Sequence, residues 1–276
     1  MSAARWLRRA LVMALLLTAV PARADAVDDA FAEGNAAADQ AHWSAAVEAY
    51  ERAGALLAQP SSLLSYNLGT AYAQLGDLGH ATFHLRQALD FRGSPTTEVA
   101  EAARSNLGIV RRRAELAAAT TSALIDRPQT WWDLVVETLR APGVGWLALV
   151  CGIVAVGLFG VERLRSAAGA RPTRWATSAF WLLAATWALA GGLHALSLRA
   201  DRTAPRAVAV PAATEARDRP GMHGTSTWSV AGGAQVRIVD RTPGWVLVRL
   251  AGGIEGWLPE SAVADLSRPF GQAQGR

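Results

Sequence analysis

The stretch Val161-Glu162-Arg163-Leu164-Arg165-Ser166-Ala167-Ala168-Gly169-Ala170-Arg171-Pro172-Thr173-Arg174 separates two long runs without charge, residues 143–160 and 175–198. The first run has 18 residues, and a helix of that length is about 27 Å long, just enough to cross a hydrocarbon core. The second run is longer and crosses with some tilt. Two buried helices of a soluble domain are the alternative. Two uncharged runs around an arginine-rich loop favour two transmembrane helices.

The arginines of this loop predict how the hairpin is oriented. Short loops rich in arginine stay on the cytoplasmic side, because the insertion machinery retains positive charge there. Residues 161–174 contain four arginines and form the expected cytoplasmic loop. The flanking regions, residues 25–142 and 199–276, are then both expected on the opposite side of the membrane.

Residues 1–24 have the three parts of a secretory signal peptide. Its positive part contains Arg5, Arg8 and Arg9. An apolar stretch follows, and Ala22-Arg23-Ala24 supplies an Ala-x-Ala cleavage pattern. If the segment were instead retained as an anchor, its positive flank would give the same topology. We therefore expect a bacterial inner-membrane protein with two spans after signal cleavage and with both folded modules in the periplasm.

The composition adds little about function. All 27 basic residues are arginine, and the formal net charge is +4. A basic chain can bind nucleic acid, but several of these arginines belong to the signal peptide and the loop. An exported domain rarely meets nucleic acid, so we expect no such partner. The single cysteine, Cys151, excludes an intrachain disulfide.

The first exported region contains an internal repeat. Residues 27–60 and 62–95 align with an offset of 35, and small residues recur at matching positions. The matched pairs are Gly34 with Gly69, Ala46 with Ala81, Tyr50 with Leu85, and Ala53 with Ala88. Paired antiparallel helices need Gly or Ala where their backbones come closest. The pattern therefore predicts two helix–turn–helix units.

These units resemble the tetratricopeptide repeat. The second unit carries the better match, with Asn67-Leu68-Gly69-Thr70-Ala71-Tyr72 followed by Leu75-Gly76-Asp77. The first unit departs from the family pattern, with Ala41 where Gly is common. A third start at Ser105-Asn106-Leu107-Gly108 has no convincing second helix, so residues 98–124 are expected to form a capping helix. The whole helical module is expected to span residues 25–126.

The resemblance implies a groove that binds a partner peptide, lined by the first helix of each unit. The groove residues it implies are Asn35, Tyr66, Asn67, Thr70 and Asn106. Phe31 and Ala102 stand where carboxylate-clamp members carry basic side chains, so an ordinary protein-binding groove is favoured over a clamp. The asparagines could instead serve only as structural hydrogen-bonding groups, and this alternative stays open.

Two connecting segments join the helical module to the rest of the chain. Residues 127–142 contain Trp131-Trp132 and place apolar side chains on one side of a helix. This pattern predicts a short interfacial helix on the membrane surface. After the second span, residues 199–206 are polar and contain a proline, which indicates a linker.

Residues 207–266 are expected to form a small all-β barrel, followed by a disordered tail at 267–276. Short apolar runs there are separated by glycine-rich turns, as is typical of antiparallel strands. The segments Gly244-Trp245-Val246-Leu247-Val248 and Gly253-Ile254-Glu255-Gly256-Trp257-Leu258 resemble the bacterial SH3-type domain. Members of that family bind peptides or cell-wall material, which implies a ligand face with Trp245 and Trp257. Alternatively, both tryptophans pack the core.

The sequence contains no pattern typical of an active site. It has no nucleotide-binding glycine loop, no nucleophile motif and no metal-ligand cluster. His80 and His84 have a metal-binding helical spacing, but they lack a third ligand. We expect no catalytic residue, no metal, no cofactor and no enzymatic activity.

The order of modules is the strongest resemblance. A signal peptide, tetratricopeptide-like repeats, a two-span hairpin and an SH3-like barrel resemble BatE-type proteins of bacterial aerotolerance operons. The resemblance implies a membrane scaffold or adaptor in an aerotolerance or envelope-stress complex. It also implies von Willebrand-type membrane proteins and a MoxR-type ATPase system as partners. A peptidoglycan-binding sensor or tether that acts through the SH3-like domain is the alternative.

Overall fold

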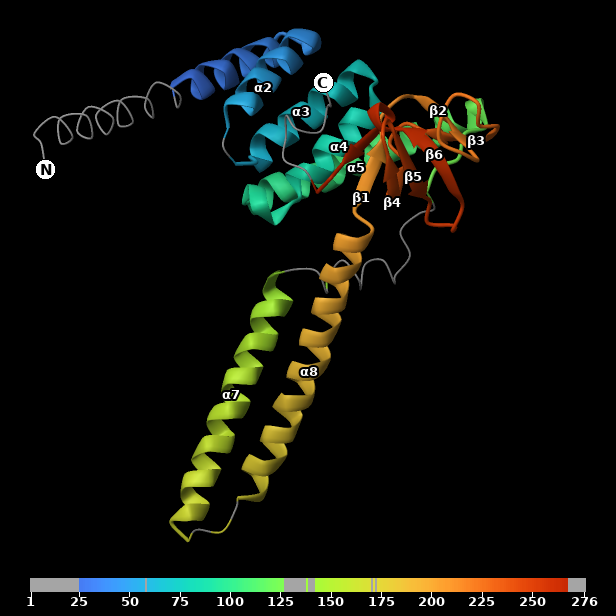
Figure 1. The fold of residues 1–276 in the computed structure, drawn as a ribbon. Coiled ribbons are helices and arrows are strands. Elements are labelled where there is room, and N and C mark those ends of the chain that lie inside the picture. Colours follow the sequence, from blue (N-terminus) through green and yellow to red (C-terminus); the bar gives the residue numbers. More distant parts are fainter. Residues whose placement is uncertain are drawn as a thin grey trace, which may run out of the picture. The chain divides into compact units, whose positions relative to one another are not determined.

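The computed structural model describes residues 25–57, 59–126, 138, 142–169, 171 and 173–267 (Figure 1). The predicted signal peptide, most of the interfacial segment 127–142 and all but the first residue of the predicted tail lie outside these ranges. The chain forms two compact units. One contains the helical module, residues 25–126, together with the sheet module, residues 206–267. The other contains the two long apolar helices.

The helical module consists of helix pairs joined by short turns. Residues 25–39 form the first helix. The others are α2 (Trp43–Leu56), α3 (Ser62–Leu75), α4 (Leu78–Ala88), the short 3₁₀ helix η1 (Phe91–Gly93) and α5 (Thr97–Thr121). Ser61, Asp77 and Thr96 begin α3, α4 and α5, because each side chain accepts a hydrogen bond from a first-turn backbone N–H.

The repeat has a steric cause that recurs with the predicted offset. A Cβ atom on Gly34 would overlap the ring of Tyr50, and one on Gly69 would lie 2.6 Å from Leu85 Cγ. Each glycine therefore lets the first helix of a pair approach the second closely. A Cβ on Gly108 would meet only Arg112, at 3.8 Å. The third start thus lacks this helix–helix contact.

The turn between the two helices of each pair also recurs. Gly76 begins the turn after α3 with a left-handed φ of 79°, which glycine adopts readily. Ala41 occupies the matching position of the first pair and has a φ of 56°. Because a Cβ makes that conformation unfavourable by about 1 kcal/mol, the first turn is the more strained of the two.

The sheet module has seven antiparallel strands. These are β1 (Arg206–Ala209), β2 (Ala213–Arg217), β3 (Ser226–Ala231), β4 (Gln235–Thr242), β5 (Trp245–Arg249), β6 (Glu255–Pro259) and β7 (Val263–Asp265), with η2 (Glu260–Ala262) before the last. Their order is β3-β2-β6-β5-β4-β1-β7. The two edge strands, β3 and β7, do not pair with each other, so the sheet is open. The prediction of a small barrel is therefore wrong in that the sheet does not close.

The sheet nevertheless covers its own core. One apolar cluster takes residues from all seven strands, including Ala207, Val230, Val248 and Leu258, all fully buried. The helices pack chiefly against β1 and β3. The inner faces of β5 and β6 must therefore be covered by other strands, which requires the sheet to curl around its cluster.

Residues 123–126 join the two modules at one sheet edge. Leu124 forms a parallel bridge with Val230 of β3: Leu124 N donates to Ser229 O at 2.6 Å, and Ala231 N donates to Leu124 O at 2.9 Å. Leu124 and Ile125 also pack against the sheet core. The end of the helical module thus supplies an edge segment to the sheet.

The second unit is a pair of long apolar helices, α7 (Pro142–Ala167) and α8 (Arg174–Thr203), which lie side by side (Figure 1). Both are long and apolar enough to span a membrane, with mean hydropathies of 2.4 and 1.4 over the most apolar 18-residue windows of Gly143–Ala167 and Arg174–Arg199. Small residues let them approach: a Cβ on Gly152 would meet the Trp187 ring at 2.8 Å.

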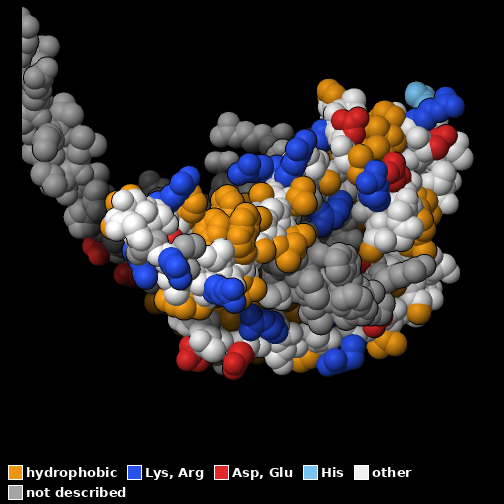
Figure 2. Space-filling view, turned by 90° about the horizontal axis from the view of Figure 1, so that it is seen from below, with side chains coloured by type: hydrophobic (Ala, Val, Ile, Leu, Met, Phe, Trp, Pro, Cys, Tyr) orange, Lys and Arg blue, Asp and Glu red, His pale blue; other side chains and the backbone are white. Residues whose placement is uncertain are grey.

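Most apolar side chains of these two helices are exposed rather than buried, as in Trp146 (66%) and Leu182 (69%). In the view of Figure 2, hydrophobic side chains cover a broad exposed area with arginine side chains beside them. A core helix of a soluble domain would bury such residues. Both helices are longer than the predicted spans. Because α7 continues through Arg163 and Arg165, much of the predicted loop 161–174 is helical.

Candidate functional site

The predicted groove asparagines form hydrogen bonds between neighbouring helices. Asn35 Oδ1 accepts a hydrogen bond from Tyr50 OH at 2.8 Å and another from Asn67 Nδ2 at 3.2 Å. Asn106 Nδ2 donates to Thr70 Oγ1 at 3.1 Å. These contacts tie the first helix to α3, and α3 to α5. The predicted residues are thus brought together, and at least part of their hydrogen bonding is structural.

Apolar side chains lie beside this polar row. Leu63 stands one helical turn before Asn67 and is 47% exposed, and Ile109 stands one turn after Asn106 and is 41% exposed. Tyr66 is half-buried against the helical core. The first helices therefore present a surface with exposed apolar groups beside half-buried amides. Such a surface can hold the side chains and the main chain of a peptide.

Tyrosine hydroxyls reinforce the helix pairs. Burial raises the pKa of Tyr50 above its ordinary value, although a hydrogen bond with Asn67 opposes this shift. Burial also raises the pKa of Tyr72, and its hydroxyl donates to Glu51 Oε1 at 2.5 Å. Both hydroxyls therefore stay neutral donors at physiological pH.

Trp245 and Trp257 lie on the outer face of the sheet. They alternate with the buried residues Val246, Val248 and Leu258, so they point away from the core and are half-buried. Leu247 pairs with Trp257 across β5 and β6. These side chains form an apolar patch on the outer surface and are not part of the core cluster.

Arg217 flanks this patch. It pairs with Trp257 in the sheet, and its guanidinium carbon lies 5.6 Å from the centre of the Trp245 ring. The guanidinium also donates to the Met222 carbonyl at 2.5 Å. A positive charge held over an aromatic ring favours a rigid aromatic surface.

The tryptophan that supports the core is a different one. Trp228 packs partly against the core cluster, and its Nε1 donates to Glu255 O at 3.3 Å. A Cβ on Gly256 would lie 3.0 Å from the Trp228 ring, so the glycine makes room for it. The motif containing Gly256 was predicted, but its partner Trp228 was not.

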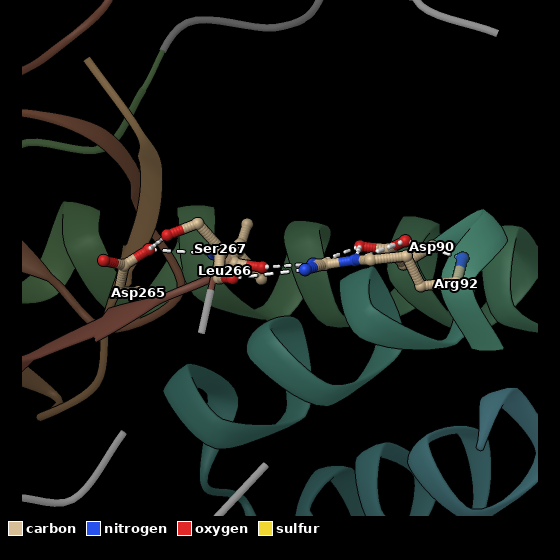
Figure 3. Close-up of polar contacts among 5 residues, drawn as sticks. All are labelled: Asp90, Arg92, Asp265, Leu266 and Ser267. Carbon is tan, nitrogen blue, oxygen red and sulfur yellow. Dashed lines mark hydrogen bonds and ion pairs between the residues drawn. The ribbon is translucent and has the colours of Figure 1, made fainter. Parts of the chain in front are cut away.

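Two polar clusters fasten the helical module to the sheet module. In Figure 3, Arg92 is held by Asp90 and donates to the carbonyls of Leu266 (3.1 Å) and Ser267 (3.2 Å). Asp265 in turn accepts from Ser267 N at 2.8 Å. Leu266 and Ser267, the two residues that follow β7, are thus hydrogen-bonded to Arg92 of η1.

The second cluster centres on Asp126, which is 9% exposed. Its Oδ1 accepts from Gln235 N at 3.1 Å, and its Oδ2 lies 3.4 Å from Arg111 NH1. Arg111 NH2 also donates to the Asp126 carbonyl at 2.9 Å. Burial raises the pKa of Asp126, although the hydrogen bond from Gln235 and the charge of Arg111 oppose this shift.

The buried imidazole of His84 belongs to the helical core. The side chain is 3% exposed and stacks on Tyr72 with ring centres 5.4 Å apart. Burial lowers the pKa of His84 to about 3, and the nearby His80 adds to the shift. The predicted absence of a metal at this pair stays a prediction. Among the residues that the structure describes, no three His, Cys, Asp or Glu side chains form a possible metal site.

His84 is expected to make the free energy of unfolding of the compact unit with the helical module decrease at acidic pH. Its pKa is lower in the folded chain than in the unfolded chain, so its stabilising effect is complete above pH 6.5. It is lost as the pH falls, because only the unfolded state then binds the proton. At pH 5 the loss is about 2 kcal/mol. Urea unfolding at several pH values measures it. His84→Gln should flatten the profile between pH 6.5 and 5, whereas the exposed control His223→Gln should not. If the free energy of unfolding of His84→Gln fell with pH as steeply as that of the wild type, protonation of His84 would not be the cause.

Searches against protein-family models, curated proteins and solved structures find no match to this chain.

Proposed function

We propose that this chain is a non-enzymatic scaffold or adaptor of the bacterial inner membrane. In this proposal α7 and α8 span the membrane, and the helical and sheet modules lie together in the periplasm. The two modules form one compact unit, although the two long helices separate them in sequence. This supports a two-span topology, because both ends of the hairpin then face the same side. The arginines between α7 and α8 support a cytoplasmic position for the turn.

The observation that carries the proposal is the repeated helix-pair contact. The close approach at Gly34 recurs at Gly69, which supports a tetratricopeptide-like arrangement with the first helices side by side. The polar row and the exposed Leu63 and Ile109 lie on those helices. A partner segment bound there would cover the apolar side chains and use the half-buried amides for orientation.

The order of modules supports a BatE-type protein as the specific identity, acting in an aerotolerance or envelope-stress complex. The sheet module then corresponds to an SH3-like domain in an open form. Von Willebrand-type membrane proteins and a MoxR-type ATPase system are the partners this identity implies. A cytoplasmic ATPase could reach the periplasmic unit only through the spans, the short turn or another membrane protein. A direct partner of the groove is therefore itself exported.

Crosslinking followed by affinity purification of the full chain from membranes tests the groove. Leu63→Asp and Ile109→Asp place a charge on the exposed apolar positions without changing the core. Each should reduce recovery of the partner at least about tenfold, which corresponds to 1.4 kcal/mol. Ala45→Asp, at another exposed position, on α2, is the control and should recover the partner normally. Equal recovery in all three variants would contradict a role for this groove.

A second function is favoured by the outward position of Trp245 and Trp257. Half-buried aromatic rings on the outer face, beside an arginine, can stack on sugar rings, which supports peptidoglycan binding by the sheet module. Sedimentation of the full chain with purified peptidoglycan tests this alternative. Trp245→Ala and Trp257→Ala should lose sedimentation while they remain folded, and Met222→Ala, an exposed apolar control, should keep it. Unchanged sedimentation in both tryptophan variants would exclude this face as the reader.

A further inference from the structure

The turn that joins α7 to α8 concentrates positive charge at one end of the hairpin. Residues 143–198 contain four arginines but a single carboxylate, Glu162. Thr173 N donates to Glu162 Oε2 at 3.4 Å, which connects the start of α8 to the end of α7 (Figure 1). The four arginines, which are all exposed, are Arg163, Arg165, Arg171 and Arg174.

Glu162 offsets only part of this charge. Its side chain is 17% exposed and lies 3.9 Å from Nη1 of Arg165, on the last turns of α7. Arg163 follows Glu162 directly, so it projects from α7 about 100° further around the helix. Among the residues that the structure describes, no carboxylate forms an ion pair with Arg163, Arg171 or Arg174. The side of the hairpin that carries Arg163 therefore has unbalanced positive charge.

Arg163 places its charge at the edge of the apolar run rather than beyond it. Its guanidinium carbon lies 5.3 Å from the centre of the Phe159 ring, about one helical turn nearer the start of α7. Long side chains of a helix point toward its N-terminus, which here is the direction of the uncharged residues 143–160. In a membrane this guanidinium would lie where the hydrocarbon ends. A charge at that depth needs a counter-ion, because water hydrates it incompletely.

Aromatic rings surround this position. The ring centres of Phe159 and Phe180 are 5.6 Å apart, and those of Phe180 and Trp181 are 5.1 Å apart. Trp181 is 66% exposed. Arg174 lies seven residues before Trp181, so both project from the same face of α8. Exposed tryptophan favours the depth of the lipid headgroups, and the phosphates of a bilayer lie at that depth.

Phosphate is the anion that fits this arrangement. Guanidinium groups bind phosphate through two parallel N–H donors, and arginines beside a membrane span attract anionic lipids. A free anion would use only the arginine. A lipid would also place its acyl chains against the exposed aromatic rings, so the pairing of Arg163 with Phe159 favours a lipid.

We infer that the turn end of the hairpin binds an anionic lipid, with Arg163 on the headgroup phosphate and the acyl chains beside Phe159 and Trp181. Arg174 adds positive charge on the face of α8 that carries Trp181. The inference rests on the proposed function in one respect, namely that α7 and α8 span a membrane. It adds a specific lipid contact to that function.

Native mass spectrometry of the purified full chain in detergent tests this inference. The probes are dioleoylphosphatidylglycerol and dioleoylphosphatidylcholine, which share their acyl chains, whereas only the first has a net negative charge. Phosphatidylglycerol should bind at least about tenfold more tightly, a difference of 1.4 kcal/mol. Arg163→Gln should weaken binding of phosphatidylglycerol at least about tenfold.

Arg165→Gln is the matched control, because it removes the same charge from the same helix end but on the side of Glu162. It should weaken binding of phosphatidylglycerol no more than about threefold. Binding of phosphatidylcholine should not change in either variant, which shows that the hairpin stays intact. Equal losses in the two variants would indicate diffuse attraction to the whole turn and would overturn the inference.

Two further outcomes would also overturn it. One is equal affinity of the wild type for the two lipids. The other is displacement of phosphatidylglycerol by an equal concentration of inorganic phosphate, which would indicate a site for free anions. Affinity in detergent does not depend on how the hairpin is oriented in cells. A failure here therefore leaves the orientation and the recovery of a groove partner as separate results.

Discussion

Asp126→Ala is expected to destabilise the compact unit formed by the helical and sheet modules by about 3 kcal/mol. The substitution removes a buried carboxylate and leaves Gln235 N–H and part of Arg111 without an acceptor. Breaking a buried charge pair in this way costs about 3–5 kcal/mol, and the partial exposure of Arg111 places the loss at the lower end. Urea unfolding of the full chain in detergent, followed by pulse proteolysis, measures the loss.

Glu115→Ala is the matched control for this experiment. Glu115 pairs with the same Arg111 at 2.9 Å, but its side chain is 41% exposed. An exposed helical pair contributes about 0.3–0.5 kcal/mol, so its removal should change little. If Asp126→Ala lost no more stability than Glu115→Ala, segment 123–126 would not be what holds the sheet to the helices.

Gly69→Ala is expected to destabilise the helical module by about 2 kcal/mol. The added Cβ would lie 2.6 Å from Leu85 Cγ and 2.9 Å from its backbone N. Because backbone must move, the strain of overpacking, about 1–3 kcal/mol or more, exceeds the gain of up to about 1 kcal/mol from replacing a helical glycine. The same unfolding assay measures the change.

Gly108→Ala should change stability in the opposite direction. Gly108 occupies the equivalent place in α5, where the nearest atom is 3.8 Å from the added Cβ. Only the gain in helix propensity remains, about 0.5–1 kcal/mol. Two identical substitutions at equivalent positions should thus have opposite signs. Equal effects at both sites would show that close helix packing is not the reason for the repeated glycine.

The repeat was predictable because its cause is local and steric. Gly34, Gly69, Ala46 and Ala81 recur at a fixed offset, and the structure places all four in buried positions. The apolar runs of α7 and α8 were predictable for a similar reason, because length and hydropathy are local properties. Their ends were not, since helices continue past the last apolar residue when the following side chains favour helix.

The sheet was harder to predict. β4, β5 and β6 carry alternating apolar residues and were expected, but β2 and β3 are rich in Thr, Ser and Glu and show no such pattern. The open order of the strands depends on β1 pairing with both β4 and β7. Such pairing joins residues that are distant in the sequence, so no local sequence pattern predicts it.

The contacts that join the helical module to the sheet module could not be predicted from the sequence. Asp126 contacts Gln235 across 109 positions, and Arg92 contacts Leu266 across 174. Each is a single polar residue in an ordinary segment. The sequence therefore indicated two exported domains, and the structure combines them into one unit. For Trp245 and Trp257, the motif predicted the strands but could not decide which face the rings occupy.

Cysteine labelling tests the membrane orientation most directly. The chain has one cysteine, Cys151, so Cys151→Ala gives a clean background for single replacements at the exposed positions Ser105, Ser166 and Ser226. Cells with a permeable outer membrane are treated with a maleimide that cannot cross the inner membrane. We predict labelling at 105 and 226 in intact cells, and labelling at 166 only after lysis. Protection of 105 or 226 in intact cells would contradict an exported scaffold.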